Sequence, residues 1–146
     1  MQRVTSSRSF QALAALSGAL YVLCLFSPAY VLQFSAEKAD PMPGYLALVL
    51  GPVMVAGGVL AWLANPMWLA GWILCARGKP WASVACATAA IALALSFLLV
   101  DTLPAGTSDM RLPFSVGAGY YLWTASIATL LLCSALSLST SGGRTA

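Results

Sequence analysis

The sequence contains few side chains that could carry chemistry. It has no histidine, 4 acidic residues and 7 basic residues among 146, so the commonest general base and metal ligand is missing and histidine-ligated haem is excluded. All carboxylates lie in short polar segments between apolar runs, whereas proton-coupled transporters need an ionisable group inside the membrane. The 4 cysteines show no Cys-x-x-Cys spacing, and no serine stands in a Gly-x-Ser-x-Gly turn. We therefore expect no enzyme activity, no cofactor and no metal site.

Two groups of residues remain as candidate contact sites. Asp101, Asp109 and Arg111 belong to a polar segment that could present a surface to a protein or a cation, although ordinary solvated loop charge is the simpler interpretation. The second group is a basic turn with nearby tryptophans, which could contact anionic lipid headgroups or serve only as membrane anchors. Its members are Trp62, Trp68, Trp72, Arg77, Lys79 and Trp81. The basic residues form no stripe along the chain, so we expect no nucleic-acid partner.

The elements that position these residues are long apolar segments. Hydrophobic residues make up 60% of the chain and charged residues 8%, whereas about one-quarter of an average soluble domain is charged. Apolar runs of this length are typical of membrane spans, so the sequence predicts an all-α integral membrane protein with a single membrane domain over residues 1–146. Four transmembrane helices are expected, at about 10–34, 45–64, 81–100 and 114–138, followed by a flexible tail at 139–146.

Two of these segments allow an alternative interpretation. The first contains Ser27-Pro28-Ala29, a pattern that a signal peptidase could cleave, although the long apolar run favours an uncleaved helix. The uncharged segment 44–76 would be about 48 Å long as one helix, more than the hydrocarbon thickness of about 30 Å. Asn65-Pro66 predicts a break, because proline lacks a backbone donor and disfavours helix in the residue before it. Residues 67–76 are then expected to form an interfacial helix, with one continuous kinked helix as the alternative.

The distribution of charge predicts the orientation of the helices. With four spans and a cytoplasmic N-terminus, the outer side carries every acidic residue, and most of the basic residues lie inside. The inner basic residues are Arg3, Arg8, Arg77, Lys79 and Arg144. This separation agrees with the positive-inside tendency of membrane proteins. We therefore expect a multi-pass protein with both termini in the cytoplasm.

Small residues at intervals of four predict where the helices meet, because close packing and interhelical hydrogen bonds drive helix association in lipid. Packing within one bundle is the simpler interpretation, and an oligomer interface is the alternative. Gly117-Ala118-Gly119 is interpreted as a close-packing element at the start of the fourth span. The expected packing positions are Ala14, Gly18, Gly57, Ala61, Ala82, Cys86, Ala90, Ala94, Ala125, Thr129 and Cys133.

Two runs of this sequence resemble segments of a known group of proteins. Residues 57–66 (GGVLAWLANP) and 117–123 (GAGYYLW) are similar to small, uncharacterised four-helix inner-membrane proteins of bacteria. The resemblance extends over the second to fourth expected spans. It implies a location in the bacterial inner (cytoplasmic) membrane, which the frequent alanine and leucine also favour, and it implies no activity, cofactor or site.

These patterns lead to three functional hypotheses. The first is a non-enzymatic membrane protein that acts through protein–protein or protein–lipid contacts, such as an accessory subunit of a membrane complex or an immunity-type protector. The second is a homo-oligomeric channel or facilitator, although the hydroxyl side chains of the fourth span scatter around the helix instead of forming one stripe. The third is a lipid-binding protein. Membrane lipids are the expected partners, together with a larger membrane complex or further copies of the chain.

Overall fold

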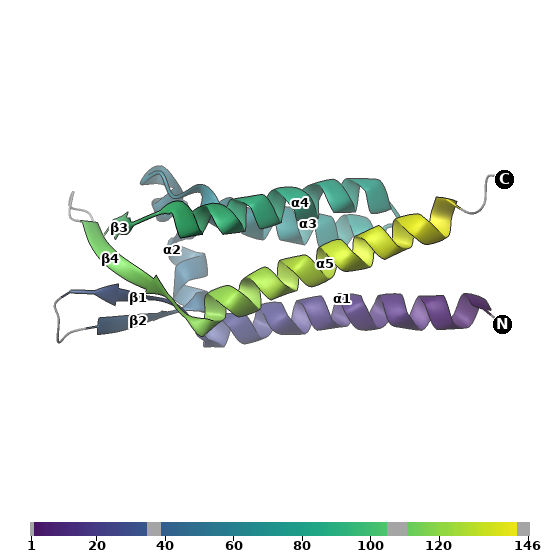
Figure 1. The fold of residues 1–146 in the computed structure, drawn as a ribbon, viewed down its shortest axis with the longest axis horizontal. Helices are drawn as coiled ribbons and strands as arrows, with labels where there is room; N and C mark the ends of the chain where they lie inside the picture. Colours follow the sequence, from purple (N-terminus) through teal and green to yellow (C-terminus); the bar gives the residue numbers. More distant parts are fainter. Residues whose placement is uncertain (1, 35–38, 105–110, 143–146) are drawn as a thin grey trace.

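The computed structural model describes residues 2–34, 39–104 and 111–142 and has a mixed α/β fold (Figure 1). Within these residues, five α-helices and two short 3₁₀-helices are combined with a four-stranded antiparallel sheet. The elements in chain order are α1 (Gln2–Phe26), β1 (Pro28–Gln33), β2 (Ala39–Pro43), α2 (Gly44–Ala56), η1 (Leu60–Leu63), α3 (Ala64–Ala76), α4 (Pro80–Ser96), η2 (Phe97–Leu99), β3 (Thr102–Pro104), β4 (Arg111–Val116) and α5 (Ala118–Gly142).

The prediction of an all-α protein with four transmembrane helices is therefore wrong. Segments assigned to loops or to the ends of spans form a sheet whose strands lie in the order β2-β1-β4-β3. Tyr30 pairs with Val116 and Leu32 with Phe114, so a segment following the first helix meets a segment preceding the last. Antiparallel pairing satisfies backbone N–H and C=O groups that the expected loops would have left to water.

The first helix ends at Phe26, well before the expected Phe34. Pro28 cannot continue the helical hydrogen-bond pattern, and the tyrosine, valine and leucine that follow it favour a strand. Burial along this strand alternates: Tyr30 and Leu32 are buried, whereas Gln33 is exposed. The alternation turns one face of β1 toward the interior of the protein.

The break in the uncharged segment 44–76 lies at Gly57–Gly58 and not at Asn65-Pro66. The second glycine has a φ of 88°, in the left-handed region that glycine adopts without strain. The proline is the third residue of α3, where its missing N–H costs no helical hydrogen bond. Residues 67–76 accordingly continue α3, and the expected Pro-broken interfacial helix does not form.

Helices α1, α3, α4 and α5 lie side by side, and the sheet and α2 lie at one end of this bundle (Figure 1). Small side chains are buried between the helices together with Trp68, Ile127 and Leu130, and several large apolar side chains lie on the outside of the bundle. Ala87 and Ala90 are fully buried, whereas Leu23, Leu69 and Leu132 are each more than half exposed. Small residues allow helix backbones to approach closely, as in membrane bundles.

Four buried serines connect the helices of the bundle, and we call Ser17, Ser83, Ser126 and Ser134 the serine seam. Ser17 Oγ donates to the Ser126 carbonyl and Ser126 Oγ donates to the Ser17 carbonyl, each at 2.9 Å. Ser17 Oγ also accepts a hydrogen bond from Trp68 Nε1 at 3.2 Å. The hydroxyls of Ser83 and Ser134 lie 2.7 Å apart. Every hydroxyl in the seam therefore has a partner.

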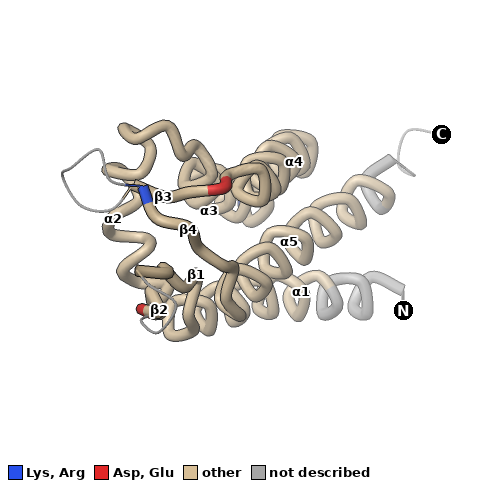
Figure 2. Tube along the Cα trace, turned by 60° about the vertical axis from the view of Figure 1, so that its left-hand side comes forward, with Lys and Arg blue, Asp and Glu red and all other residues tan. Residues whose placement is uncertain are grey.

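By length and composition alone, two segments in the described part of the chain could cross a bilayer, Pro80–Leu99 and Ala118–Ser139. Only 28% of the apolar window in each is buried inside the protein. Figure 2 shows no charged position along α4 or α5, whereas charged positions gather at the sheet end. The charged residues at the sheet end are Asp40, Asp101 and Arg111, and the turn between α3 and α4 carries Arg77 and Lys79.

Candidate functional site

A cavity of about 100 Å³ lies where the sheet meets the helical bundle. It is partly open to the surface, and no charged side chain is found among its lining residues in the described chain. Engineered apolar cavities of about 150 Å³ bind benzene, so this cavity has roughly the size of one ring. The side chains and glycines that line it include Tyr21, Cys24, Tyr30, Ala47, Gly51, Ala61, Trp62, Asn65, Phe97, Leu103, Tyr120 and Trp123.

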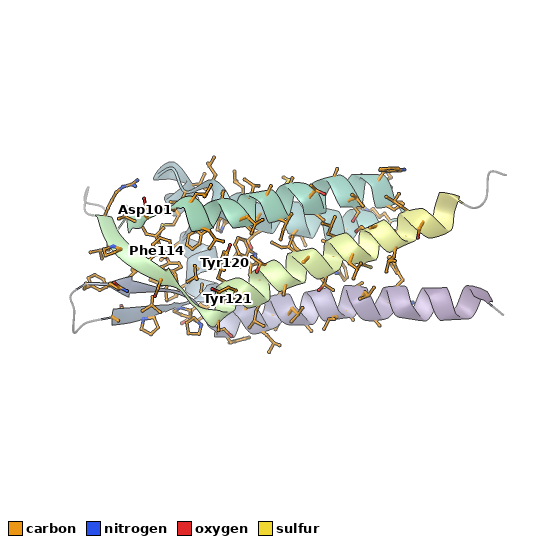
Figure 3. The ribbon with its side chains drawn as sticks, in the orientation of Figure 1. Asp101, Phe114, Tyr120 and Tyr121 are labelled. Atoms are coloured by element: carbon orange, nitrogen blue, oxygen red, sulfur yellow. The ribbon has the colours of Figure 1, made fainter. Side chains whose placement is uncertain are left out.

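Aromatic rings form much of the cavity wall. The ring centroid of Phe97 lies 6.1 Å from that of Tyr30 and 5.7 Å from that of Tyr120. Trp123 continues this series, with its centroid 6.0 Å from Tyr120. Figure 3 shows Phe114 and Tyr120 at the junction between the sheet and the helices. Rings in such offset and edge-on arrangements present both faces and edges to a bound apolar molecule.

The hydroxyl of Tyr30 is buried without a hydrogen-bond partner among the residues that the structure describes. The side chain of Tyr30 is only 5% exposed and packs beside Phe97 and Phe114. Burial raises the pKa of Tyr30 above its ordinary value of 10.0, because the apolar surroundings disfavour the phenolate. An unpaired buried hydroxyl is costly to the folded state.

Asn65 holds the helical side of the cavity together. Its Oδ1 accepts hydrogen bonds from the Tyr21 hydroxyl at 2.9 Å and from Trp123 Nε1 at 3.0 Å. Its Nδ2 donates to the Trp62 carbonyl at 3.0 Å. One amide thus ties α1, η1 and α5 to α3. The sequence reasoning identified Asn65-Pro66 only as a helix break and missed this role, because the partners are distant in the chain.

Trp62 closes one side of the cavity. Its indole packs on Gly51, where any side chain would overlap the ring, and its Nε1 donates to the Leu48 carbonyl at 2.8 Å. The glycine in α2 is therefore required by close approach and not by backbone conformation. Trp62 was predicted at the membrane interface, and in the structure its side chain fixes α2 against η1.

The expected packing positions divide into buried and exposed ones. Ala61, Ala90, Ala94 and Cys133 are buried in the protein interior. Ala14 packs against the core as a partly buried residue. Gly18, Gly57, Cys86 and Thr129 are of intermediate burial, and Ala82 and Ala125 are exposed. The buried faces of α4 and α5 also include Ser83, Ser126 and Ser134 of the serine seam.

The expected interfacial residues do not form one cluster. Trp68 is buried and stacks on Tyr21, with ring centroids 4.1 Å apart. Trp72 is partly exposed and donates to the Ala14 carbonyl at 3.3 Å. Trp81 is 76% exposed at the start of α4. Arg77 and Lys79 are exposed beside it, so only this turn keeps the expected surface character.

The expected outer-loop site is partly described. Asp101 and Arg111 are exposed and line one shallow hollow together with Gly57 and Gly58. Arg111 donates from Nη2 to the Gly57 carbonyl at 3.2 Å, so it ties β4 to the turn after α2. Asp109 lies outside the described residues. The structure thus gives Arg111 a structural contact and assigns no ligand to this hollow.

Sequence reasoning missed Tyr30 and the cavity. The alternation of β1 was available in the sequence, but the position of the hydroxyl depends on the pairing of β1 with β4. Among the described residues, no group of three or more cysteine or acidic side chains could hold a metal ion. Comparison of the chain with protein-family models, with curated proteins and with solved structures finds no match.

Proposed function

We propose that this protein is a non-enzymatic membrane protein that binds an apolar, lipid-like ligand in the cavity between its sheet and its helical bundle. Ligand sites are typically concave, mostly apolar and supplied with a few polar groups that fix orientation. The cavity has this composition, with aromatic walls, no charged lining side chain in the described chain, and the amide residue Asn65 among its lining residues. The apolar, aromatic lining is the observation that carries the proposal.

The surface of the bundle supports a membrane location. A soluble protein would bury its large apolar side chains, whereas Val22, Leu23, Leu98 and Leu132 are all more than half exposed here. Lipid tails are as apolar as leucine, so such a surface costs nothing in a bilayer. Carbonate extraction of membranes tests this part of the proposal: the protein should remain in the membrane pellet, and release into the soluble fraction would contradict it.

The proposed location is the bacterial inner membrane, with the sheet on the outer side and both termini in the cytoplasm. The exposed basic turn with Arg77 and Lys79 lies at the bundle end away from the sheet (Figure 1). Asp40 and Asp101 lie at the sheet end. This separation is the one that the positive-inside tendency favours.

The other hypotheses receive less support. A partner that adds a strand to the sheet would meet prolines on both edge strands, Pro41 and Pro43 in β2 and Pro104 in β3, which limit strand addition. A pore between copies would need a polar helix face, but the hydroxyls of Thr124 and Thr129 bond to the backbone of their own helix. Neither observation favours a channel or an edge-bound partner.

Blocking the cavity tests the proposal directly. Hexylbenzene, a ring with a short apolar tail, serves as the probe, and native mass spectrometry of the detergent-solubilised protein gives the bound fraction. Ala47 lines the cavity on α2, so Ala47→Phe should fill it and reduce binding at least tenfold. Ala56→Phe is the matched control, because Ala56 is exposed on the same helix and does not line the cavity. Equal binding to both variants would contradict the proposal.

A further inference from the structure

Helix α2 has two faces of different composition. Its inward face lines the cavity and includes the small residues Gly44, Ala47 and Gly51. Its outward face carries large apolar side chains, of which Val49 and Val53 are 70% and 63% exposed. The exposed large side chains of this face, which we call the α2 stripe, are Tyr45, Leu46, Val49, Leu50 and Val53.

Water is an unfavourable neighbour for the α2 stripe. No residue of Gly44–Ala56 is charged, and the only polar side-chain group in this helix is the hydroxyl of Tyr45. A helix that faces water carries polar residues on its exposed side, whereas a helix that is apolar all round belongs in a protein core or in a membrane. Helix α2 also contacts α1, which ends with the exposed side chains of Leu23 and Phe26. The exposed apolar surface therefore extends over both helices.

The position of α2 places the stripe near the edge of the hydrocarbon layer. Pro80–Leu99 contains 20 residues, and a helix of this length rises about 30 Å, which is about the thickness of the hydrocarbon. In the proposed orientation, Asp101 therefore lies at the outer membrane surface. It lines a hollow together with Gly57, which follows α2, and Arg111 donates to the Gly57 carbonyl. The other end of α2 packs on the backbone of α1, so α2 lies across the sheet end of the bundle (Figure 1).

Lipid acyl chains fit the α2 stripe better than a protein helix does. Membrane helices that pack on one another place small residues at their contact, because small residues let the two backbones approach closely. In α2 the small residues Gly44, Ala47 and Gly51 belong to the inward face, and the stripe consists of large side chains. Acyl chains are as apolar as leucine and need no close backbone approach.

We infer that the α2 stripe is embedded among the acyl chains of the outer leaflet, so that α2 has lipid on one face and the cavity on the other. This inference rests on the membrane location in the proposed function and assigns a partner to one wall of the cavity. That partner is lipid hydrocarbon, and not water, a second copy of the chain or another protein. An apolar molecule dissolved in the leaflet is thereby brought within one helix diameter, about 10 Å, of the cavity.

A nitroxide spin label at position 49 tests the inference. Val49→Cys is labelled in the purified protein and reconstituted in phosphatidylcholine vesicles. The collision rate of the label with oxygen, which concentrates in hydrocarbon, is compared with its collision rate with a water-soluble nickel chelate. Asp40→Cys is the matched control, because Asp40 is exposed in β2 at the same end of the molecule. The wild type, whose four cysteines are buried or of intermediate burial, gives the background.

We expect the ratio of oxygen to nickel collisions to be about tenfold higher at position 49 than at position 40, because water and its solutes are excluded from the hydrocarbon. The spectrum at position 49 should show no dipolar broadening. Equal ratios at the two positions would show that α2 faces water and would overturn the inference. Dipolar broadening at position 49 would show that a second copy covers the stripe and would also overturn it.

A benzophenone side chain at position 49 extends the test to the native membrane. After illumination its adducts should be with lipid, identified by mass spectrometry, and an adduct with another protein would overturn the inference. Val49 is 70% exposed, so neither substitution disturbs the core.

The outcomes separate the inference from the ligand site. If the label at position 49 contacts water while hexylbenzene still binds and Ala47→Phe still blocks it, the inference is overturned and the ligand site stands. If the label lies in hydrocarbon but hexylbenzene does not bind, the ligand site fails and the inference stands. Release of the protein by carbonate extraction would contradict both the proposed membrane location and the inference.

Discussion

The helical bundle and the cavity region differ in whether their buried polar groups have hydrogen-bond partners. In the bundle, the serine seam is fully buried, and each of its hydroxyls donates to or accepts from a neighbouring helix or its own backbone. Beside the cavity, Tyr30 is 5% exposed, and its buried hydroxyl has no partner in the described part of the chain. Both regions lie in the same small protein, so the difference in hydrogen bonding is local to each region.

The comparison shows that buried polar groups contribute to stability with opposite sign in the two regions. A satisfied polar network fixes the helices relative to one another. An unsatisfied buried group lowers stability instead. Asn65 stands at the boundary, because its amide belongs to the satisfied network while it also lines the cavity.

The largest expected effect comes from removing the amide at that boundary. Asn65→Leu would leave the Tyr21 hydroxyl and the Trp123 indole N–H without their acceptor. An orphaned buried donor costs about 1–3 kcal/mol, and because these two are partly buried the free energy of unfolding should fall by about 3 kcal/mol in total. Denaturation by sodium dodecyl sulfate in mixed micelles measures this quantity. Gln33→Leu, at an exposed position, is the control and should change stability little. A loss no greater than the control would show that the amide does not hold the bundle.

A smaller loss is expected within the serine seam. Ser17→Ala removes the donor to the Ser126 carbonyl and the acceptor of Trp68 Nε1. The free energy of unfolding should fall by about 2 kcal/mol, because the indole N–H is left unpaired inside the bundle. Ser139→Ala is the control, since its exposed hydroxyl bonds only to its own helix, and it should cost less than about 0.5 kcal/mol. Equal losses of unfolding free energy in the two variants would show that the buried hydroxyl of Ser17 stabilises the protein no more than an exposed one.

A substitution at Tyr30 should raise the free energy of unfolding, whereas the two substitutions above lower it. Tyr30→Phe removes a buried hydroxyl without breaking a hydrogen bond in the described protein. Without ligand, the free energy of unfolding should rise by about 1 kcal/mol, since the desolvation cost of the hydroxyl disappears. Thermal unfolding in detergent measures this difference, and the variant should be more stable than the wild type. A destabilised, ligand-free Tyr30→Phe would mean that the hydroxyl has a protein partner in solution.

The positions of the helices could be predicted largely from composition and from the proline and glycine residues near their ends. The expected span at 81–100 agrees closely with α4 and η2, because an uninterrupted alanine- and leucine-rich run follows Pro80. Gly117 and Gly119 lie against the carbonyl of Pro28, as expected of a close-packing element. These features depend on residues near one another in the chain. Sequence patterns report such local preferences well.

The sheet and the cavity depend on contacts between distant residues. Strand β1 resembles the end of an apolar span, and its pairing with β2 and β4 shows it to be a strand. Several expected packing positions are buried, such as Ala90, Ala94 and Cys133. Ala82 and Ala125 are exposed, whereas the adjacent Ser83 and Ser126 are fully buried. Intervals of four occur on several faces of an alanine-rich helix, so spacing alone cannot select the face that a neighbouring helix covers.

The smallest expected effect is a lack of pH dependence in ligand binding. No charged side chain lines the cavity in the described chain, and burial raises the pKa of Tyr30, which keeps its hydroxyl protonated beyond the usual range. The affinity for hexylbenzene should therefore stay constant between about pH 5 and 8.

The raised pKa of Tyr30 also determines the direction in which stability changes at higher pH. A tyrosine whose pKa is raised in the folded state contributes its full share of stability below the pKa of the unfolded chain, and this share is lost as pH rises through the folded pKa. Stability should thus fall only above about pH 10, and less steeply in Tyr30→Phe than in the wild type. A pH-dependent affinity between about pH 5 and 8 would instead require a charged group beside the ligand. That result would contradict the uncharged cavity from which the ligand class is inferred.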